Sequence, residues 1–390
     1  MKSKKIILSL LIYLLGTVLL LCSDFYISKN FNEIGVANWA TLKSIIFVFG
    51  GVCIFGFDQI LVRKPELFKR VVRRYLFQIL LSSIVIGFLL KKYFIDDYNF
   101  LYISIVIFLY AFSQFCAAAF RGSGKLVEAQ FFTNGWKIFT ILFLLLGVVN
   151  LSYVYIFSFF LVCILGSYTI YNYEKLNNEF VFPLKNQYKL GFFFLLNSLS
   201  LTMATYGEQL LINAFGNKVV STIVFNYILA FNSFILLFVG FLGFYFVPKL
   251  KQIERFNENK YKDYMKKFFW LGFILCGFGF GFGFVIFKYY LNIEVNIVLA
   301  LLCLISAYVK ILYIIPSVGV SLYCDEEKVA KISIFNLYNL GFYVFIFFIS
   351  MVIFNEYLVH SVFLVMSMHW FLRLLNTHKF VVQALREQNV

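Results

Sequence analysis

Long apolar runs separated by short polar segments follow one another along the whole chain. A helix needs about 20 mostly apolar residues to cross a bilayer. The runs are continuously apolar rather than alternating, which argues against the strands of a membrane barrel. We therefore predict an all-α polytopic membrane protein. Its twelve expected membrane helices cover residues 6–27, 38–62, 75–92, 100–120, 127–149, 153–172, 191–213, 219–247, 268–288, 295–320, 332–354 and 358–377.

Composition supports the same fold class. Of the 390 residues, 62% are hydrophobic and only 14% are charged, whereas globular chains carry about 25% charged residues. A soluble domain could not bury this much apolar surface. The basic residues Lys2, Lys4 and Lys5 precede the first apolar run, as in a signal peptide, but Cys22-Ser23-Asp24 is a poor cleavage site. We expect this segment to remain as the first membrane helix.

Lysine and arginine predict the orientation of the helices. With a cytoplasmic N-terminus, 26 of the 34 basic residues fall in cytoplasmic segments and five fall outside, while Lys43, Lys137 and Lys310 lie within spans. Cytoplasmic loops of membrane proteins carry this excess of basic residues. Both termini are therefore expected to be cytoplasmic. The net charge of +15 then needs no nucleic-acid partner.

Two halves of six helices each are expected: residues 1–172, a cytoplasmic linker at 173–190, and residues 191–390. Asp24 and Glu208 lie near the outer end of the first helix of their half, and a phenylalanine follows each of them seven residues later. Parallel repeats of this kind are typical of alternating-access transporters. The loops are too short to hold a soluble domain, so function is expected within the membrane and not as an enzyme.

Candidate metal ligands and cofactor motifs are scarce in the sequence. The seven cysteines are scattered without a C-x-x-C pair, and we expect them to act as small hydrophobes. His360, His369 and His378 show no ligand spacing. No ATP-binding motif is present. The sequence therefore predicts neither a cofactor nor a metal site.

One charged residue lies in the middle of the fifth expected span. Lys137 is too far from either end to reach water by extending its side chain, and a charge at the membrane centre costs about 2.5–3.5 kcal/mol. Gln130, Thr133, Asn134 and Thr140 form a polar stripe with it at helical spacing. We expect the stripe to line a central cavity. The alternative is a buried lysine paired with a carboxylate for structural reasons.

Other charges fall within spans as well. Lys310 is fifteen residues into the tenth span and is a second candidate for the cavity, whereas Lys43 either lines the cavity or extends outward. Glu208 and the weaker candidate Asp24 are expected to bind a coupling ion. For Glu208, pairing with a lysine and a position that simply tolerates a charge near the membrane surface are equal alternatives. Arg373 is near the inner end of the last span and is expected to anchor it at the interface.

Several short segments resemble a known transporter family, the Wzx-type polysaccharide and O-antigen flippases of the multidrug/oligosaccharidyl-lipid/polysaccharide (MOP) exporter superfamily. The similarity extends through the topology over nearly the whole chain. The segments that carry it are Thr205-Tyr206-Gly207-Glu208-Gln209, Asn213-Ala214-Phe215-Gly216, Tyr227, Phe246-Val247-Pro248-Lys249-Leu250, the region from Asp24 to Arg63, and Arg121-Gly122-Ser123-Gly124-Lys125.

The resemblance implies two six-helix lobes that form a V around a central cavity in a bacterial cytoplasmic (inner) membrane. It also implies a function, the transfer of an undecaprenyl-pyrophosphate-linked oligosaccharide, such as an O-antigen or capsule repeat unit, to the outer leaflet. Expected partners are this lipid-linked substrate, membrane lipids and polysaccharide assembly proteins. Lys137 and Lys310 would offset the pyrophosphate charge, and an ion gradient would drive transport.

Two other functions remain open. A multidrug or cation antiporter of the same superfamily would share the topology, although a cationic interior disfavours cationic drugs. A membrane polysaccharide polymerase or acyltransferase is a weaker alternative, because it would need a large external loop or a catalytic His, Asp or Arg cluster. Neither feature is visible in the sequence.

Overall fold

Every element in the described part of the chain is helical. The computed structural model describes residues 2–93, 98–148, 150–173, 185–215, 218–240, 242, 256–353 and 357–387. Most of the expected linker at 173–190 lies outside these residues, as do Gly216 and the segment from Phe246 to Leu250.

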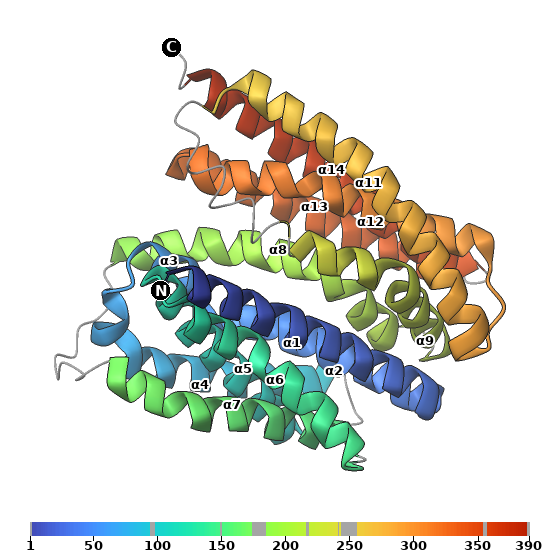
Figure 1. The fold of residues 1–390 in the computed structure, drawn as a ribbon, viewed down its shortest axis with the longest axis horizontal. Helices are drawn as coiled ribbons and strands as arrows, with labels where there is room; N and C mark the ends of the chain where they lie inside the picture. Colours follow the sequence, from blue (N-terminus) through green and yellow to red (C-terminus); the bar gives the residue numbers. More distant parts are fainter. Residues whose placement is uncertain are drawn as a thin grey trace. The chain divides into compact units, whose positions relative to one another are not determined.

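The helices follow the apolar runs closely (Figure 1). Two stretches of π-helix, η1 and η2, interrupt or end the α-helices of the C-terminal half. The elements are α1 (Lys2–Asn30), α2 (Glu33–Ile54), α3 (Phe57–Arg63), α4 (Leu67–Tyr93), α5 (Phe100–Gly122), α6 (Leu126–Leu145), α7 (Leu151–Tyr173), α8 (Lys185–Phe215), α9 (Lys218–Tyr227), η1 (Ile228–Asn232), α11 (Glu258–Val285), η2 (Ile286–Leu291), α12 (Ile297–Tyr323), α13 (Glu326–Ile353) and α14 (Leu358–Glu387).

Ten helices in the described residues are long and apolar enough to cross a membrane. They comprise α1, α2, α4, α5, α8, the helical stretch Lys218–Gly240, the stretch Glu258–Leu291, α12, α13 and α14. The fifth and sixth predicted spans coincide with α6 and α7, where α7 contains a shorter apolar helix, Leu151–Ser167. The ten helices indicate a multi-pass membrane protein, and the total of twelve spans stays a prediction.

The second expected span, 38–62, is not one helix. Phe55 and Gly56 have positive φ angles of 51° and 72°, which end α2 and start the short helix α3. A side chain at position 56 would collide with the backbone oxygen of Gly191 in α8. Glycine therefore permits both the left-handed turn and the close approach of α8.

The last helix also differs from the expectation. The apolar pattern stops near residue 377, but α14 continues to Glu387. The final turns are amphipathic, because Val381, Ala384 and Leu385 are buried between exposed polar residues. A hydropathy pattern detects the apolar part of a helix and misses such an extension.

The described residues form two compact units. Unit 1 contains Met1–Ile27 and Asn38–Thr202, and unit 2 contains Ser28–Ala37 and Met203–Val390. The division of the chain into two six-helix halves joined at residues 173–190 stays a prediction.

Unit 1 is a bundle of α3–α7 with parts of α1, α2 and α8 (Figure 1). Large aromatic side chains fill its core. Trp39 stacks on Tyr155 with ring centroids 4.6 Å apart, and Trp136 contacts Phe159 at 4.6 Å. These rings bring α2, α6 and α7 together around one apolar centre.

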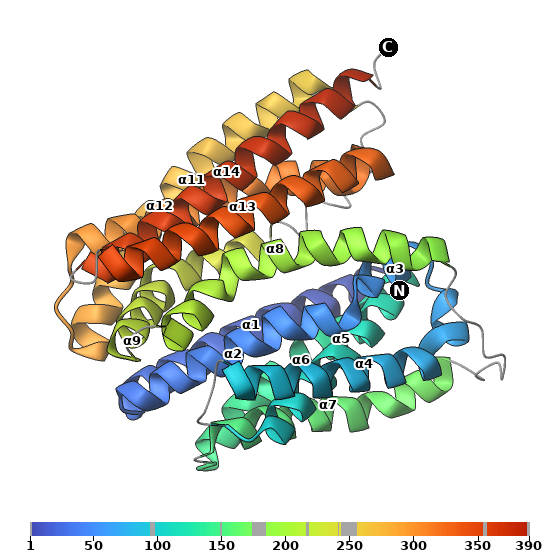
Figure 2. The same cartoon turned by 180° about the vertical axis from the view of Figure 1, so that it is seen from behind.

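Unit 2 contains α9 and α11–α14 together with the end of α8 (Figure 2). Its core includes Tyr227, Phe231 and Phe287, whose rings are 4.6–5.8 Å apart. A side chain at Gly279 or Gly283 would collide with Ile235 or Phe231. These glycines therefore let α11 pack closely against the helix that contains η1.

Candidate functional site

A buried ion pair joins the first two helices of unit 1. The Lys43 ammonium lies 2.5 Å from Asp24 Oδ2, and the Trp39 indole N–H donates to Asp24 Oδ1 at 2.8 Å. Asp24 is 2% exposed. Both carboxylate oxygens therefore have a donor, and Asp24 and Lys43 are brought together as one paired group.

A chain of hydrogen bonds follows one face of α6. The Lys137 ammonium donates to Asn134 Oδ1, and the Asn134 amide donates to Gln130 Oε1, both at 2.5 Å. Gly16 of α1 is close to Asn134, because a side chain there would come within 2.8 Å of its carbonyl oxygen. Lys137 also interacts electrostatically with Lys43 and Asp24. We call these six residues the Asp24 cluster: Asp24, Trp39, Lys43, Gln130, Asn134 and Lys137.

Thr140 belongs to a different contact. Its hydroxyl is fully buried and lies 2.9 Å from the Trp136 carbonyl oxygen and 3.2 Å from the Ser158 hydroxyl. Thr140 therefore packs between α6 and α7. The helical spacing from Lys137 did not reveal this contact, because residues three apart still differ by about 60° around a helix.

In unit 2, Glu208 and Lys310 are both buried, with 2% and 3% of their surface exposed. They interact electrostatically across α8 and α12. The Lys310 ammonium lies over the ring of Trp370 at 5.3 Å from its centroid. The Trp370 indole N–H donates to the Ala204 carbonyl oxygen at 2.8 Å. Trp370 of α14 therefore touches both α12 and the turn of α8 that precedes Glu208.

Arg373 is not the interfacial anchor that its place near the end of the apolar run predicted. It is fully buried, and its guanidinium lies over the ring of Tyr313 at 5.3 Å. The prediction was wrong because α14 continues to Glu387, which places Arg373 well inside the helix. Lys310 and Tyr313 on α12 therefore face Trp370 and Arg373 on α14, and each cation covers a ring of the other helix.

Polar atoms of three more side chains gather beside this arrangement. The Tyr343 ring of α13 packs on the His369 ring of α14 at 4.9 Å, and the Asn339 amide donates to the His369 carbonyl oxygen at 3.0 Å. Tyr343 also interacts electrostatically with Glu208. We call the following residues the Glu208 cluster: Glu208, Lys310, Tyr313, Asn339, Tyr343, His369, Trp370 and Arg373.

Several buried atoms of the Glu208 cluster have no hydrogen-bond partner among the described residues. They are Glu208 Oε2, the Tyr343 hydroxyl, Asn339 Oδ1 and both ring nitrogens of His369. A buried polar group without a partner costs about 1–3 kcal/mol. Sequence reasoning missed Tyr343 and His369, because only the packing of α13 on α14 brings their rings together.

Other polar residues of α8 serve packing. The Asn213 amide donates to the Ser221 hydroxyl at 2.7 Å, and Ser221 donates to Gln209 Oε1 at 2.9 Å. These bonds connect α8 to α9. Gln209 and Asn213 therefore belong to a contact separate from Glu208.

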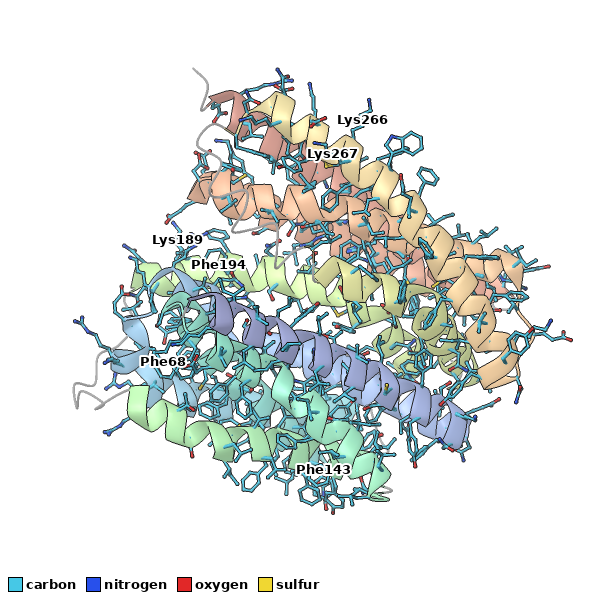
Figure 3. The ribbon with its side chains drawn as sticks, in the orientation of Figure 1. Phe68, Phe143, Lys189, Phe194, Lys266 and Lys267 are labelled. Carbon is cyan, nitrogen blue, oxygen red and sulfur yellow. The ribbon has the colours of Figure 1, made fainter. Side chains whose placement is uncertain are left out.

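Exposed ion pairs join the helix ends at one side of unit 2. Arg386 contacts both carboxylate oxygens of Glu258, at 2.7 and 2.9 Å, and Lys328 contacts Asp325 and Glu387. The backbone N–H and ammonium of Lys328 hold the pKa of Asp325 below its usual value. Lys266 and Lys267 are exposed near the start of α11 (Figure 3).

Metal ligands do not gather in the described part of the chain. No three His, Cys, Asp or Glu side chains there form a group that could hold a metal ion. Glu208 and His369 lie among cations instead, which disfavours a bound metal.

Comparison with known proteins matches this fold to solved transporters. No family model and no curated protein matches the chain. An inward-facing multidrug resistance MATE family transporter of the MOP superfamily is 16% identical, with a TM-score of 0.61, over 98% of this chain and 99% of the other. An outward-facing structure of a multidrug resistance MATE family transporter is 15% identical, with a TM-score of 0.57, over 98% of this chain and 96% of the other. The MATE transporter VcmN of Vibrio cholerae in a bent form is 11% identical, with a TM-score of 0.54, over 99% of both chains. The protein therefore has the fold of the MATE transporters of the MOP superfamily, a fold solved in both inward- and outward-facing conformations.

Proposed function

We propose that the protein is a flippase that moves an undecaprenyl-pyrophosphate-linked oligosaccharide to the outer leaflet of a bacterial inner membrane. It does so by alternating access, with twelve membrane helices and both termini in the cytoplasm. A MATE-like fold supports transport in general. The proposed substrate class rests on the charged side chains that are buried between the helices.

The observation that carries the proposal is an excess of cations in the two clusters. Lys43, Lys137, Lys310 and Arg373 are basic, whereas only Asp24 and Glu208 are acidic. A charge in the membrane centre costs about 2.5–3.5 kcal/mol. Unbalanced cations in such a place favour an anionic ligand, and a pyrophosphate headgroup is one.

The sugar part of the substrate would need hydroxyl and amide groups. Gln130 and Asn134 supply amides beside Lys137 in unit 1. We assign Lys137, with these amides, to the headgroup and its first sugar. Lys43 is held by Asp24, so within the Asp24 cluster the positive charge left for the headgroup is that of Lys137.

The second candidate is a multidrug or cation antiporter. The likeness to multidrug resistance MATE transporters favours it, but a fold does not determine a substrate. Cationic drugs would meet the same excess of cations, which we expect to exclude them.

The test is export of surface polysaccharide in a host whose chromosomal copy is deleted and replaced by variants. Lys137→Ala and Lys310→Ala are each expected to abolish surface polymer and to leave lipid-linked intermediates in the inner leaflet. Lys331→Ala is the control, because Lys331 is exposed and forms a salt bridge with Glu327 in the same helix. Cells with the Lys331→Ala variant should export surface polysaccharide normally.

Protein levels of all variants are measured in the same cells. Normal polymer in both Lys137→Ala and Lys310→Ala would contradict the role of the cations. Drug susceptibility of the deletion host, with and without the wild-type chain, separates the second candidate. A flippase should leave drug susceptibility unchanged, whereas an antiporter should raise resistance.

A further inference from the structure

The basic residues at the start of α4 produce a strong excess of positive charge in unit 1. Residues 63–74 contain six arginines and lysines and a single acidic residue, Glu66. The first turn of α4 holds no acidic residue, although the N-terminus of a helix carries a partial positive charge that disfavours cations. The cations and the helix dipole therefore repel each other, and an anion bound here would relieve that repulsion.

The start of α11 in unit 2 is also basic, but protein carboxylates balance much of its charge. Lys262 pairs with Glu258 at 2.7 Å, and Lys267 pairs with Asp263 at 2.8 Å. Residues 258–267 contain four lysines and these two acidic residues. At the start of α4, one carboxylate cannot balance six cations. A basic helix end of this chain therefore need not carry such an excess, and the end at α4 favours an anionic partner.

An exposed apolar stripe continues from these cations along one face of α4. Arg70 and Arg73 are exposed, and the stripe follows them at steps of three and four residues, which keep side chains on one face of a helix. Its members, with 68, 53, 41 and 55% of their surface exposed, are Phe77, Leu81, Ile84 and Phe88.

The length of the stripe matches one leaflet of a bilayer. The eleven residues from Phe77 to Phe88 rise about 16 Å at about 1.5 Å per residue. Half of the hydrocarbon core of a bilayer is about 15 Å thick. The face of α4 therefore presents cations and then an apolar surface, in the order and at the length of a phospholipid headgroup and its acyl chain.

We propose that this face of α4 binds an anionic diacyl phospholipid, with its headgroup at Arg70 and Arg73 and an acyl chain along the stripe. A guanidinium group donates two parallel N–H bonds to a phosphate, which suits arginine to this task. A zwitterionic lipid offers the same chains without a net charge, so the arginines select for the anionic headgroup. The bound lipid is a resident partner of unit 1 and not the transported substrate, so the inference does not depend on the proposed function.

Photocrosslinking of the full-length protein in lipid nanodiscs tests the site. The probe is phosphatidylglycerol with a diazirine in one acyl chain, and the crosslinked peptides are mapped by mass spectrometry. We expect crosslinks at residues 77–88, and unlabelled phosphatidylglycerol should displace the probe better than phosphatidylcholine with the same chains. Each basic residue near an anionic membrane surface contributes about fivefold to binding. The double variant Arg70→Gln/Arg73→Gln should therefore raise the mole fraction of probe that gives half-maximal crosslinking by about tenfold or more.

Lys266→Gln/Lys267→Gln is the matched control. It removes two cations at the start of α11, where Trp270 and Phe273 are exposed apolar residues as well. This variant should leave crosslinking at residues 77–88 unchanged. Monodisperse size-exclusion profiles establish that each variant is folded.

Equal displacement of the probe by phosphatidylglycerol and phosphatidylcholine would overturn the proposal. So would a wild-type half-maximal mole fraction in Arg70→Gln/Arg73→Gln. Stronger displacement by undecaprenyl pyrophosphate than by phosphatidylglycerol would overturn it too, because the occupant would then be a polyprenyl lipid. Nothing is transported in this assay, so it can fail while the polysaccharide export test succeeds, and the reverse also holds.

Discussion

The Asp24 cluster and the Glu208 cluster hold buried charges in different ways. In unit 1 the carboxylate contacts its cation directly, and a tryptophan N–H occupies the other oxygen. In unit 2 one oxygen of the carboxylate has no hydrogen-bond partner among the described residues, and the cations lie over aromatic rings. Both arrangements keep charges away from water.

The difference indicates which cluster depends more on its carboxylate for stability. Removing a proton acceptor from a fully bonded pair breaks several contacts at once, whereas an aromatic ring tolerates a cation with or without a nearby carboxylate. We therefore expect the Asp24 cluster to be mainly a fixed structural pair beside Lys137, and the Glu208 cluster to depend less on its carboxylate. Four substitutions test this contrast.

The largest effect is expected from Asp24→Asn. It keeps an acceptor for Trp39 but removes the charge that balances Lys43, and breaking a buried pair in this way costs about 3 kcal/mol or more. Thermal unfolding in detergent should show a markedly lower Tm. Asp24→Asn combined with Lys43→Met should recover much of the loss, and an additive double variant would show that the pair does not act as a unit.

A smaller effect is expected from Lys310→Met, although Lys310 is equally buried. The variant loses a cation–ring contact worth about 2 kcal/mol and keeps most of the packing. Its Tm should lie between those of Asp24→Asn and wild type. A loss as large as that of Asp24→Asn would mean that Lys310 and Glu208 form a fixed pair as well.

Trp370→Phe should have the third largest effect. The ring over Lys310 remains, but the hydrogen bond to the Ala204 carbonyl is lost, at a cost of about 1 kcal/mol. Trp270→Phe is the matched control, because Trp270 is 60% exposed on α11. Equal Tm values for both variants would show that the bond between α14 and α8 contributes nothing to stability.

The smallest effect is expected from the exposed pair of Asp325 and Lys328, which provides a solvent-screened reference for both clusters. Because its folded-state pKa is lowered by Lys328, Asp325 stabilises the fold above its unfolded pKa. That contribution is lost as pH falls through the folded pKa. Asp325→Asn keeps the bond to the Lys328 N–H and should only weaken this acid dependence, which thermal scans across pH would measure. An unchanged acid dependence would contradict the assignment.

Much of the fold could be predicted from apolar runs alone, because the membrane requires long helices with satisfied backbones. The failures are local. The run 38–62 hid the turn at Phe55 and Gly56, since both flanks are apolar and only the contact with Gly191 reveals the need for glycine. The polar turns after residue 377 hid the true end of α14.

The site was predicted only where it lies on one helix. Gln130, Asn134 and Lys137 are three and four residues apart, and they form a connected chain as the spacing suggests. Their role in substrate binding stays a proposal. His369 was missed and Arg373 was assigned to the interface, because their surroundings come from α13 and α12, which no spacing along α14 can show.

Lys310 of α12 and Arg373 of α14 each lie over an aromatic ring of the other helix. This arrangement also bears on how the chain enters the membrane. Synthesis proceeds from the N-terminus, so Glu208 is inserted before Lys310, and Trp370 and Arg373 follow last. A newly inserted α12 therefore has its carboxylate partner available in α8 but lacks the ring that will cover its ammonium. The order of the helices lets the cations Lys310 and Arg373 arrive after Glu208 and Tyr313, respectively, which lowers the cost of inserting a cationic segment into lipid.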